Sequence, residues 1–130
     1  MKKAVVFGGS GFIGSHVSDY LTKVGYQVTI YDTKESQWLL EGQKMVIGNI
    51  DNIEKINQTI AEAEVVYNFA ALADLNEAIK EPIKTIKINI LGNLNVMEAC
   101  CKHRVKRFVY ASTVYVHSRE GGFYRCSKQA

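Results

Sequence analysis

A glycine-rich turn near the start of the chain most constrains what it can fold into. Residues Ala4–Phe7 are apolar and predict a strand, and Phe12–Val24 has the apolar period of a helix. We expect Gly8 to leave the strand in a conformation that a Cβ atom resists, Gly11 to admit a pyrophosphate, and Gly14 to let the helix lie close to the strand. The free N–H groups of the helix's first turn would then face the phosphates.

An acidic residue follows this turn at the distance expected for dinucleotide binding. Asp32 ends the apolar run Val28–Tyr31, about twenty residues after the glycines. A carboxylate there accepts hydrogen bonds from the adenosine ribose and repels a 2′-phosphate, which favours NAD over NADP. Lys34 lies close by and acts against that preference. The alternative interpretation is a glycine turn without a ligand and a surface aspartate.

Size and composition are those of one ordinary globular domain. The chain has 130 residues and a formal net charge of +3, which is too small to indicate nucleic-acid binding. Its basic cluster, Lys102–Arg107, falls where a helix should end, and cations favour that position. The three cysteines suggest neither a disulfide framework nor a metal site. With no signal peptide or membrane span in the sequence, we expect a cytoplasmic protein that binds no membrane.

Strand and helix signals alternate along the whole chain. This alternation predicts parallel β-α-β units and hence a doubly wound α/β sheet of the Rossmann type. The later expected strands are Lys44–Ile47, Glu64–Phe69 and Arg107–Ala111, and the later helices are Asn52–Glu62 (capped by Asp51 or Asn52), Asp74–Lys80 and Ile83–Lys102, with a short helix or loop over Thr33–Gly42. In the long helix, the stripe Ile86, Ile90, Leu94 and Met97 would pack on the sheet, and Ile79 and Ile83 would need a partner helix.

A tyrosine and a lysine near the end of the chain, Tyr124 and Lys128, are four residues apart and share one face of a helix. A nearby ammonium stabilises a phenolate, so the pair can move a proton to or from a substrate hydroxyl while a nicotinamide carries the hydride. The hydroxyl of Thr113, or alternatively Ser112, would hold the substrate oxygen.

These motifs together resemble the N-terminal part of the extended short-chain dehydrogenase/reductase family, the NAD-dependent nucleotide-sugar epimerases and dehydratases. The glycine turn matches, as do Thr113, Tyr124 and Lys128, which the resemblance identifies as the catalytic residues. Three further elements are similar, with Asn49-Ile50 in place of an Asp-hydrophobic pair, Asn68-Phe69-Ala70-Ala71 in place of His-x-Ala-Ala, and Pro82 followed by Asn89-Ile90-Leu91-Gly92-Asn93 in place of Pro and Asn-x-x-Gly-Thr.

The resemblance also implies a full set of cofactor contacts and a homodimer. In the family the long helix and the Tyr-Lys helix pack across a dimer interface. The cofactor-binding residues expected from the motifs and the resemblance are Gly8, Gly11, Phe12, Ile13, Gly14, Asp32, Thr33, Asn49, Ile50, Phe69, Ala70, Ala71, Ile88, Asn89, Tyr124 and Lys128.

The chain departs from the family pattern in the segment before Tyr124. The family spaces its Ser/Thr and Tyr by about two dozen residues, and Thr113 and Tyr124 are much closer. Val114 and Tyr115 stand where the family's dehydratases carry Asp-Glu, which argues against dehydration.

We therefore expect residues 1–130 to be an incomplete NAD-binding Rossmann domain of an epimerase or reductase that acts on a nucleotide sugar, with the substrate domain lying beyond Ala130 and with no catalysis by this part alone. The frayed, barely begun Tyr-Lys helix is one expected reason for that inactivity. The rival hypothesis is a non-catalytic NAD-binding sensor or scaffold on the same fold. The sequence does not identify the sugar nucleotide.

Overall fold

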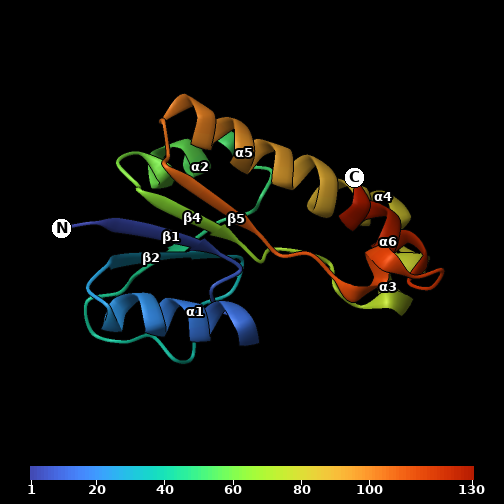
Figure 1. Ribbon diagram of the computed structural model, residues 1–130, viewed down its shortest axis with the longest axis horizontal. Helices are drawn as coiled ribbons and strands as arrows, with labels where there is room; N and C mark the ends of the chain where they lie inside the picture. Colours follow the sequence, from blue (N-terminus) through green and yellow to red (C-terminus); the bar gives the residue numbers. More distant parts are fainter.

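The computed structural model describes residues 1–130 as a five-stranded, fully parallel sheet with strand order β3-β2-β1-β4-β5 (Figure 1). This confirms the predicted fold class. The strands are β1 Lys3–Phe7, β2 Gln27–Asp32, β3 Lys44–Ile47, β4 Val65–Asn68 and β5 Arg107–Tyr110. The helices are α1 Phe12–Lys23, α2 Ile53–Ile60, α3 Leu75–Lys80, α4 Pro82–Ile86, α5 Asn93–Lys102 and α6 Gly122–Gln129, with a π-helical segment η1 Lys87–Gly92 and a 3₁₀ segment η2 Val114–His117.

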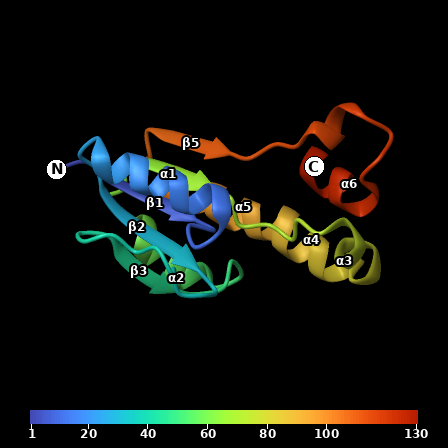
Figure 2. The ribbon, with the colours of Figure 1, turned by 90° about the horizontal axis from the view of Figure 1, so that it is seen from below.

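The helices are distributed over both faces and one end of the sheet. Helix α1 covers one face, while α2 and α5 cover the other (Figure 1). Helices α3, α4 and α6 lie together beyond the carboxyl ends of the strands, and Figure 2 shows the same grouping from below. Phe7 pairs with Tyr31 on one side and Asn68 on the other, so the carboxyl ends of the three central strands are level. In open parallel sheets, ligands bind at this end.

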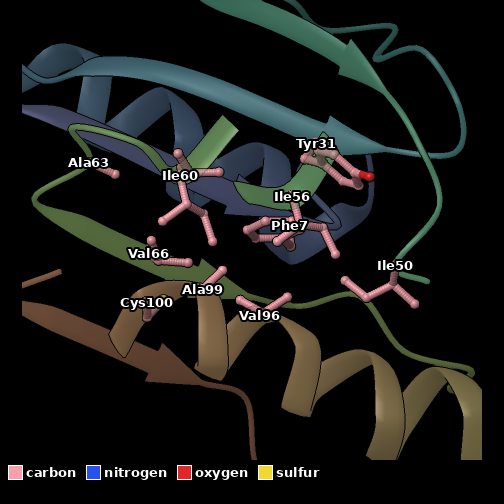
Figure 3. Close-up of a cluster of buried hydrophobic side chains, with 11 residues drawn as sticks. Phe7, Tyr31, Ile50, Ile56, Ile60, Ala63, Val66, Val96, Ala99 and Cys100 are labelled. Atoms are coloured by element: carbon pink, nitrogen blue, oxygen red, sulfur yellow. The ribbon is translucent and has the colours of Figure 1, made fainter. Parts of the chain in front are cut away.

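The larger part of the core lies between the sheet and helices α2 and α5. Phe7 and Tyr31 contribute their rings from the central strands, Ile56 and Ile60 come from α2, and Val96 comes from α5 (Figure 3). All five are at most 2% exposed. A second buried cluster, centred on Val6, Ile30 and Leu21, lies under α1. With apolar residues buried against helices on both faces, the strands are the continuous apolar runs expected of a parallel sheet.

The long predicted helix is divided into three segments. Pro82 begins α4 as expected, but the chain then widens into the π-helical η1 before α5. A 3.6-residue apolar period does not distinguish an α-turn from a π-turn, so the apolar pattern did not indicate this change. Within η1, Asn89 and Gly92 are buried, and a Cβ atom on Gly92 would collide with the side chain of Ile50.

The apolar stripe of this long helix faces outward, contrary to the expectation that it packs on the sheet. Ile86, Leu94 and Met97 are 44%, 52% and 43% exposed, and Ile90 is half-buried. The face that meets the sheet carries smaller residues, which allow the helix to approach closely: Gly92, Val96, Ala99 and Cys100. Ile79 and Ile83 are exposed, as expected.

Several local features refine the predicted elements. Asn52, and not Asp51, caps α2, because its Oδ1 accepts a hydrogen bond from the backbone N–H of Lys55 at 3.1 Å. Residues 33–42 form a loop without a helix, and the side chains of its apolar insert, residues 38–40, are all exposed. Because the insert has no buried face, tertiary packing does not stabilise a helix there.

Helix α6 runs for eight residues and buries Ser127 and Lys128. No helix of the structure is long and apolar enough to span a lipid bilayer.

Candidate active site

Each of the three glycines of the first turn has the geometry that its predicted role requires. Gly8 has a φ of +75°, and a Cβ atom there would come within 2.7 Å of the backbone of Ala70. A Cβ atom on Gly14 would collide with the carbonyl oxygen of Gly8, so only glycine lets α1 begin this close to β1. At Gly11 a Cβ atom would meet only the carbonyl oxygen of Gly8, at 3.4 Å, and the residue is exposed. The turn therefore leaves an uncovered strip of backbone before the first turn of α1.

A cleft of about 560 Å³ opens in front of this turn at the carboxyl ends of β1, β2 and β4. Ten of the predicted cofactor-binding residues line the cleft, and they come from five separate segments of the chain. These ten are Gly8, Gly11, Asp32, Thr33, Asn49, Ile50, Phe69, Ala70, Ala71 and, from η1, Ile88.

Hydrogen bonds fix Asp32 at the end of β2. Its Oδ2 accepts the backbone N–H of Ser10 at 3.1 Å, and its Oδ1 accepts the N–H of Lys34 at 3.3 Å. The hydroxyl of Thr33 donates to the same Oδ1 at 3.4 Å. These bonds join the carboxylate to the glycine turn, so it is held at the cleft wall.

Buried aromatic and amide groups position the loop after β3. The hydroxyl of Tyr31 donates to the carbonyl oxygen of Asn49 at 2.7 Å, and Asn95 of α5 donates to the carbonyl oxygen of Ile50 at 3.1 Å. Burial raises the pKa of Tyr31, and the charge of Asp51 adds to this effect, so the phenol keeps the proton that it donates. The loop therefore presents Asn49 and Ile50 to the cleft from a fixed backbone.

The side chains of Asn68 and Asn89 form hydrogen bonds to other groups of the chain, and neither residue lines the cleft. Asn68 is 1% exposed, donates to Oδ1 of Asn93 at 2.8 Å, and accepts the N–H of Ala70 at 3.0 Å. Asn89 is buried behind the cleft wall and does not line it. Its Oδ1 accepts the N–H of Leu72 at 2.8 Å, and its Nδ2 donates to the carbonyl oxygen of Leu72 at 3.2 Å and to the hydroxyl of Ser127 at 2.9 Å.

Two predicted cofactor residues, Phe12 and Ile13, have side chains outside the cleft. They are 79% and 59% exposed on the first turn of α1. Their backbone N–H groups belong to the helix N-terminus, where amide groups have no partner within the helix. Any contact with a ligand at these positions is therefore expected from the backbone.

The predicted catalytic residues gather beyond the end of β5. Thr113 follows the strand, and its hydroxyl oxygen accepts the N–H of Tyr115 at 3.4 Å, which leaves the hydroxyl proton free for another acceptor. Lys128 reaches back from α6, so that its ammonium donates to the carbonyl oxygen of Ala111 at 3.0 Å. Tyr124 lies on α6 one turn before Lys128 and packs edge-on against Tyr115. Ser112, the alternative to Thr113, is exposed.

The environment of Lys128 is apolar and aromatic. Its Nζ lies 4.4 Å from the ring centre of Tyr110, and the residue is 7% exposed. Burial lowers the pKa of Lys128 from 10.5 to about 8, so the ammonium remains protonated at neutral pH. Burial also raises the pKa of Tyr110, with the charge of Tyr124 as a second cause. The end of β5 thus holds one buried cation, Lys128, over the ring of Tyr110.

Some residues of the site carried no signal in the sequence. Leu72 and Lys84 line the cleft, and Lys84 lies 3.5 Å from both Glu77 and Glu81. These residues belong to α3, α4 and the segment before them, whose approach to the cleft depends on the tertiary fold. Tyr110 reads as an ordinary strand residue in the sequence. No group of three or more His, Cys, Asp or Glu residues has a geometry that could hold a metal ion.

A family model, NAD dependent epimerase/dehydratase, matches residues 4–125. The chain belongs to this family. Over 91% of its length it is 30% identical to the UDP-glucose 4-epimerase of Schizosaccharomyces pombe. The crystal structure of the UDP-glucose 4-epimerase of Thermotoga maritima with UDP-glucose matches 98% of the chain at 27% identity, with a TM-score of 0.90. That of the Brucella ovis UDP-glucose 4-epimerase in complex with NAD matches 99% at 27% identity, with a TM-score of 0.88.

The comparisons confirm both the family resemblance and the expectation of NAD as the family's cofactor. They also show that the chain is short for its family. It spans 38% of the length of the Schizosaccharomyces enzyme, 48% of the Thermotoga chain and 45% of the Brucella chain.

Proposed function

We propose that this chain is the NAD-binding and acid–base part of a nucleotide-sugar epimerase or reductase that works through a keto sugar. One observation carries the proposal. Thr113, Tyr124 and Lys128 lie beyond the carboxyl end of β5, at the same end of the sheet as the cleft that holds Gly11 and Asp32. A cofactor site and a proton-transfer site at the same sheet end are what an oxidoreduction at a sugar carbon requires.

The residues of the cleft fit NAD. Gly11 leaves space for a diphosphate beside the start of α1, and helix N-termini bind such anions. Asp32 would accept hydrogen bonds from the ribose that carries adenine, while Ile50 offers an apolar surface to the base. Ile88 from η1 also lines the cleft, and Lys84 adds a cation to its lining.

When bound, the nicotinamide would accept a hydride from the sugar carbon and return it later. Tyr124 would take the proton of the hydroxyl on that carbon and give it back to the carbonyl oxygen. Lys128, one turn after Tyr124 on α6, would supply the positive charge of this pair. Thr113 would donate its free hydroxyl proton to the reacting oxygen. An epimerase would return the hydride to the opposite face of the sugar, and a reductase would release the product after one transfer.

A nucleotide sugar is the proposed substrate class, supported by the UDP-glucose named in a relative's structure. The substrate domain is expected in the part of the family's length that this chain does not span. Val114 is 78% exposed next to Thr113 and carries no acid–base group. This supports epimerisation or reduction in preference to dehydration.

A homodimer is the proposed assembly. The outward stripe of α4, η1 and α5 exposes five large apolar side chains on one continuous helical stretch: Ile83, Ile86, Leu91, Leu94 and Met97. Exposed apolar surface of this extent is typical of a protein–protein interface, and a twofold pairing of the same helices would cover it in both subunits.

The test uses the full-length protein with NAD and UDP-glucose, followed by other UDP-sugars. We expect turnover that falls by about 10³-fold or more in Tyr124→Phe, because general acid–base catalysis contributes about 10²–10⁴-fold. NAD affinity, measured by calorimetry, should change little in that variant. NAD binding without turnover of any sugar nucleotide would support the rival function, a non-catalytic NAD-binding module, and refute the enzyme.

A further inference from the structure

The segment between Thr113 and α6 is short, and it folds back on the site. It begins with η2 directly after Thr113, whose side chain caps this 3₁₀ turn by accepting the N–H of Tyr115. The N–H of Ser118 then closes the turn on the carbonyl oxygen of Tyr115 at 3.1 Å. Tyr115 is therefore joined through its backbone to the hydroxyl of Thr113.

Two side chains of α6 hold this segment against the helix. Arg125 donates from Nη1 to the carbonyl oxygen of Ser118 at 3.0 Å, and Gln129 donates from Nε2 to the carbonyl oxygen of Val116 at 3.0 Å. Arg125 and Gln129 are four residues apart and follow Tyr124 and Lys128 by one position each. One side of α6 thus carries the proposed acid–base pair, and the adjoining side holds the segment.

The ring of Tyr115 packs directly against the ring of Tyr124. The ring centres are 6.2 Å apart and the planes are inclined by 80°, which is an edge-to-face contact. Gly121 completes the arrangement with a φ of +96°, and a Cβ atom there would lie 2.9 Å from Cβ of Tyr115. Only glycine at this position leaves Tyr115 where it is. The hydroxyl of Tyr115 has no hydrogen-bond partner in the chain, so its ring makes the contact.

We propose that Tyr115 is a positioning residue for the reaction, which fixes the ring of Tyr124 and, through its backbone, the hydroxyl of Thr113. The inference rests on the proposed function. A phenol on an eight-residue helix can rotate about its side-chain bonds, whereas an edge-on neighbour restricts it to one orientation. The proton that Tyr124 transfers then has a fixed origin relative to the oxygen that Thr113 holds. Small misplacements of reacting groups reduce rates strongly.

The test compares Tyr115→Leu, which keeps an apolar side chain without a ring, with Tyr115→Phe, which keeps the ring. Val114→Ala is the matched control, since Val114 lies in the same turn and is 78% exposed. In the full-length protein we expect Tyr115→Leu to lower kcat by about tenfold with KM nearly unchanged, and Tyr115→Phe and Val114→Ala to keep kcat within about twofold. Aromatic NMR signals of Tyr124, assigned with Tyr124→Phe, should shift only in Tyr115→Leu.

The two measurements separate the possible failures. Unchanged Tyr124 signals in Tyr115→Leu would overturn the inference whatever the activity. Shifted signals with unchanged kcat, when Tyr124→Phe is inactive, would also overturn it while leaving the proposed function intact. Full activity of Tyr124→Phe would overturn the proposed function and the positioning role together. A kcat that falls equally in Tyr115→Leu and Tyr115→Phe would assign the effect to the hydroxyl and refute the role of the ring.

Discussion

The buried ammonium of Lys128 should make the stability of the protein depend on pH in a defined direction. Its pKa falls from 10.5 to about 8 in the folded state, with burial as the cause. Below pH 8 the folded and unfolded states both carry the proton, so the folded state bears the full cost of the buried charge. Between pH 8 and 10.5 the folded state loses the proton while the unfolded state keeps it, and stability rises with pH.

The magnitude follows from the size of the pKa shift of Lys128. This shift corresponds to a loss of about 3 kcal/mol from the free energy of unfolding at neutral pH. The contact of Nζ with the ring of Tyr110 and its bond to the carbonyl oxygen of Ala111 both favour the charged form, so about 3 kcal/mol is an upper bound. We therefore expect Lys128→Met to be more stable than the wild type by up to about 3 kcal/mol at pH 7, and the difference to vanish near pH 10.5.

Urea unfolding of the wild type and of Lys128→Met, from pH 7 to 10.5, measures this difference in stability. The comparison must be made between variants, because burial also raises the pKa of Cys100 to about 11, which lowers stability as the pH rises above 9. Lys87→Met is the matched control, since Lys87 is exposed and has no ion pair. Equal stability of Lys128→Met and wild type at pH 7, with the same pH dependence, would refute the argument that burial governs this lysine.

Further predictions address the cofactor site, the fold and the assembly. Asp32→Ala should weaken NAD binding and reduce its preference over NADP in titrations of the full-length protein, and tighter binding of NADP by the wild type would contradict the role of Asp32. Gly14→Ala should destabilise the fold by roughly 1–3 kcal/mol in urea unfolding, because its Cβ would collide with Gly8, and a change below about 0.5 kcal/mol would contradict this. Leu94→Lys should convert the full-length protein from dimer to monomer in light scattering, whereas a wild-type monomer at micromolar concentration would contradict the proposed interface. Residues 1–130 alone should bind NAD weakly, measured by calorimetry, and should not turn over a sugar nucleotide in a coupled assay, because the substrate would have no second wall; turnover within about tenfold of the full-length protein would contradict this.

What the sequence predicts well is what neighbouring residues determine. The strand positions follow from apolar runs of four to six residues, and the bounds of all five lie within one residue of those predicted. The glycine turn could be predicted because it joins a strand and a helix that are adjacent in the sequence, and Gly14 meets the carbonyl oxygen of Gly8 within that same unit. The level ends of the strands then bring Asp32, Asn49 and Ala70 to one cleft, as the doubly wound topology requires.

What the sequence could not predict depends on segments far apart in the chain. The stripe through Leu94 looks like a core face because it is the more apolar one, yet the sheet selects the smaller face that contains Ala99. Close packing of this helix on the sheet decides which of its faces is buried, and it outweighs the greater hydrophobicity of the other face. The side-chain amide of Asn89 is hydrogen-bonded to Leu72, in the loop after β4, and to Ser127, in α6. No local pattern reveals such partners. The burial of Ser127 and Lys128 on α6 likewise depends on tertiary packing, which helix propensity alone does not predict.

The amide of Asn89 has a mechanical consequence for the molecule. Leu72 forms part of the cleft wall, Ser127 belongs to the helix that bears Tyr124, and one buried side chain is bonded to both. A molecule that contacts Leu72 therefore contacts a residue bonded to the same amide that is bonded to α6. A shift of the cleft wall and a shift of α6 therefore both act on this one buried amide.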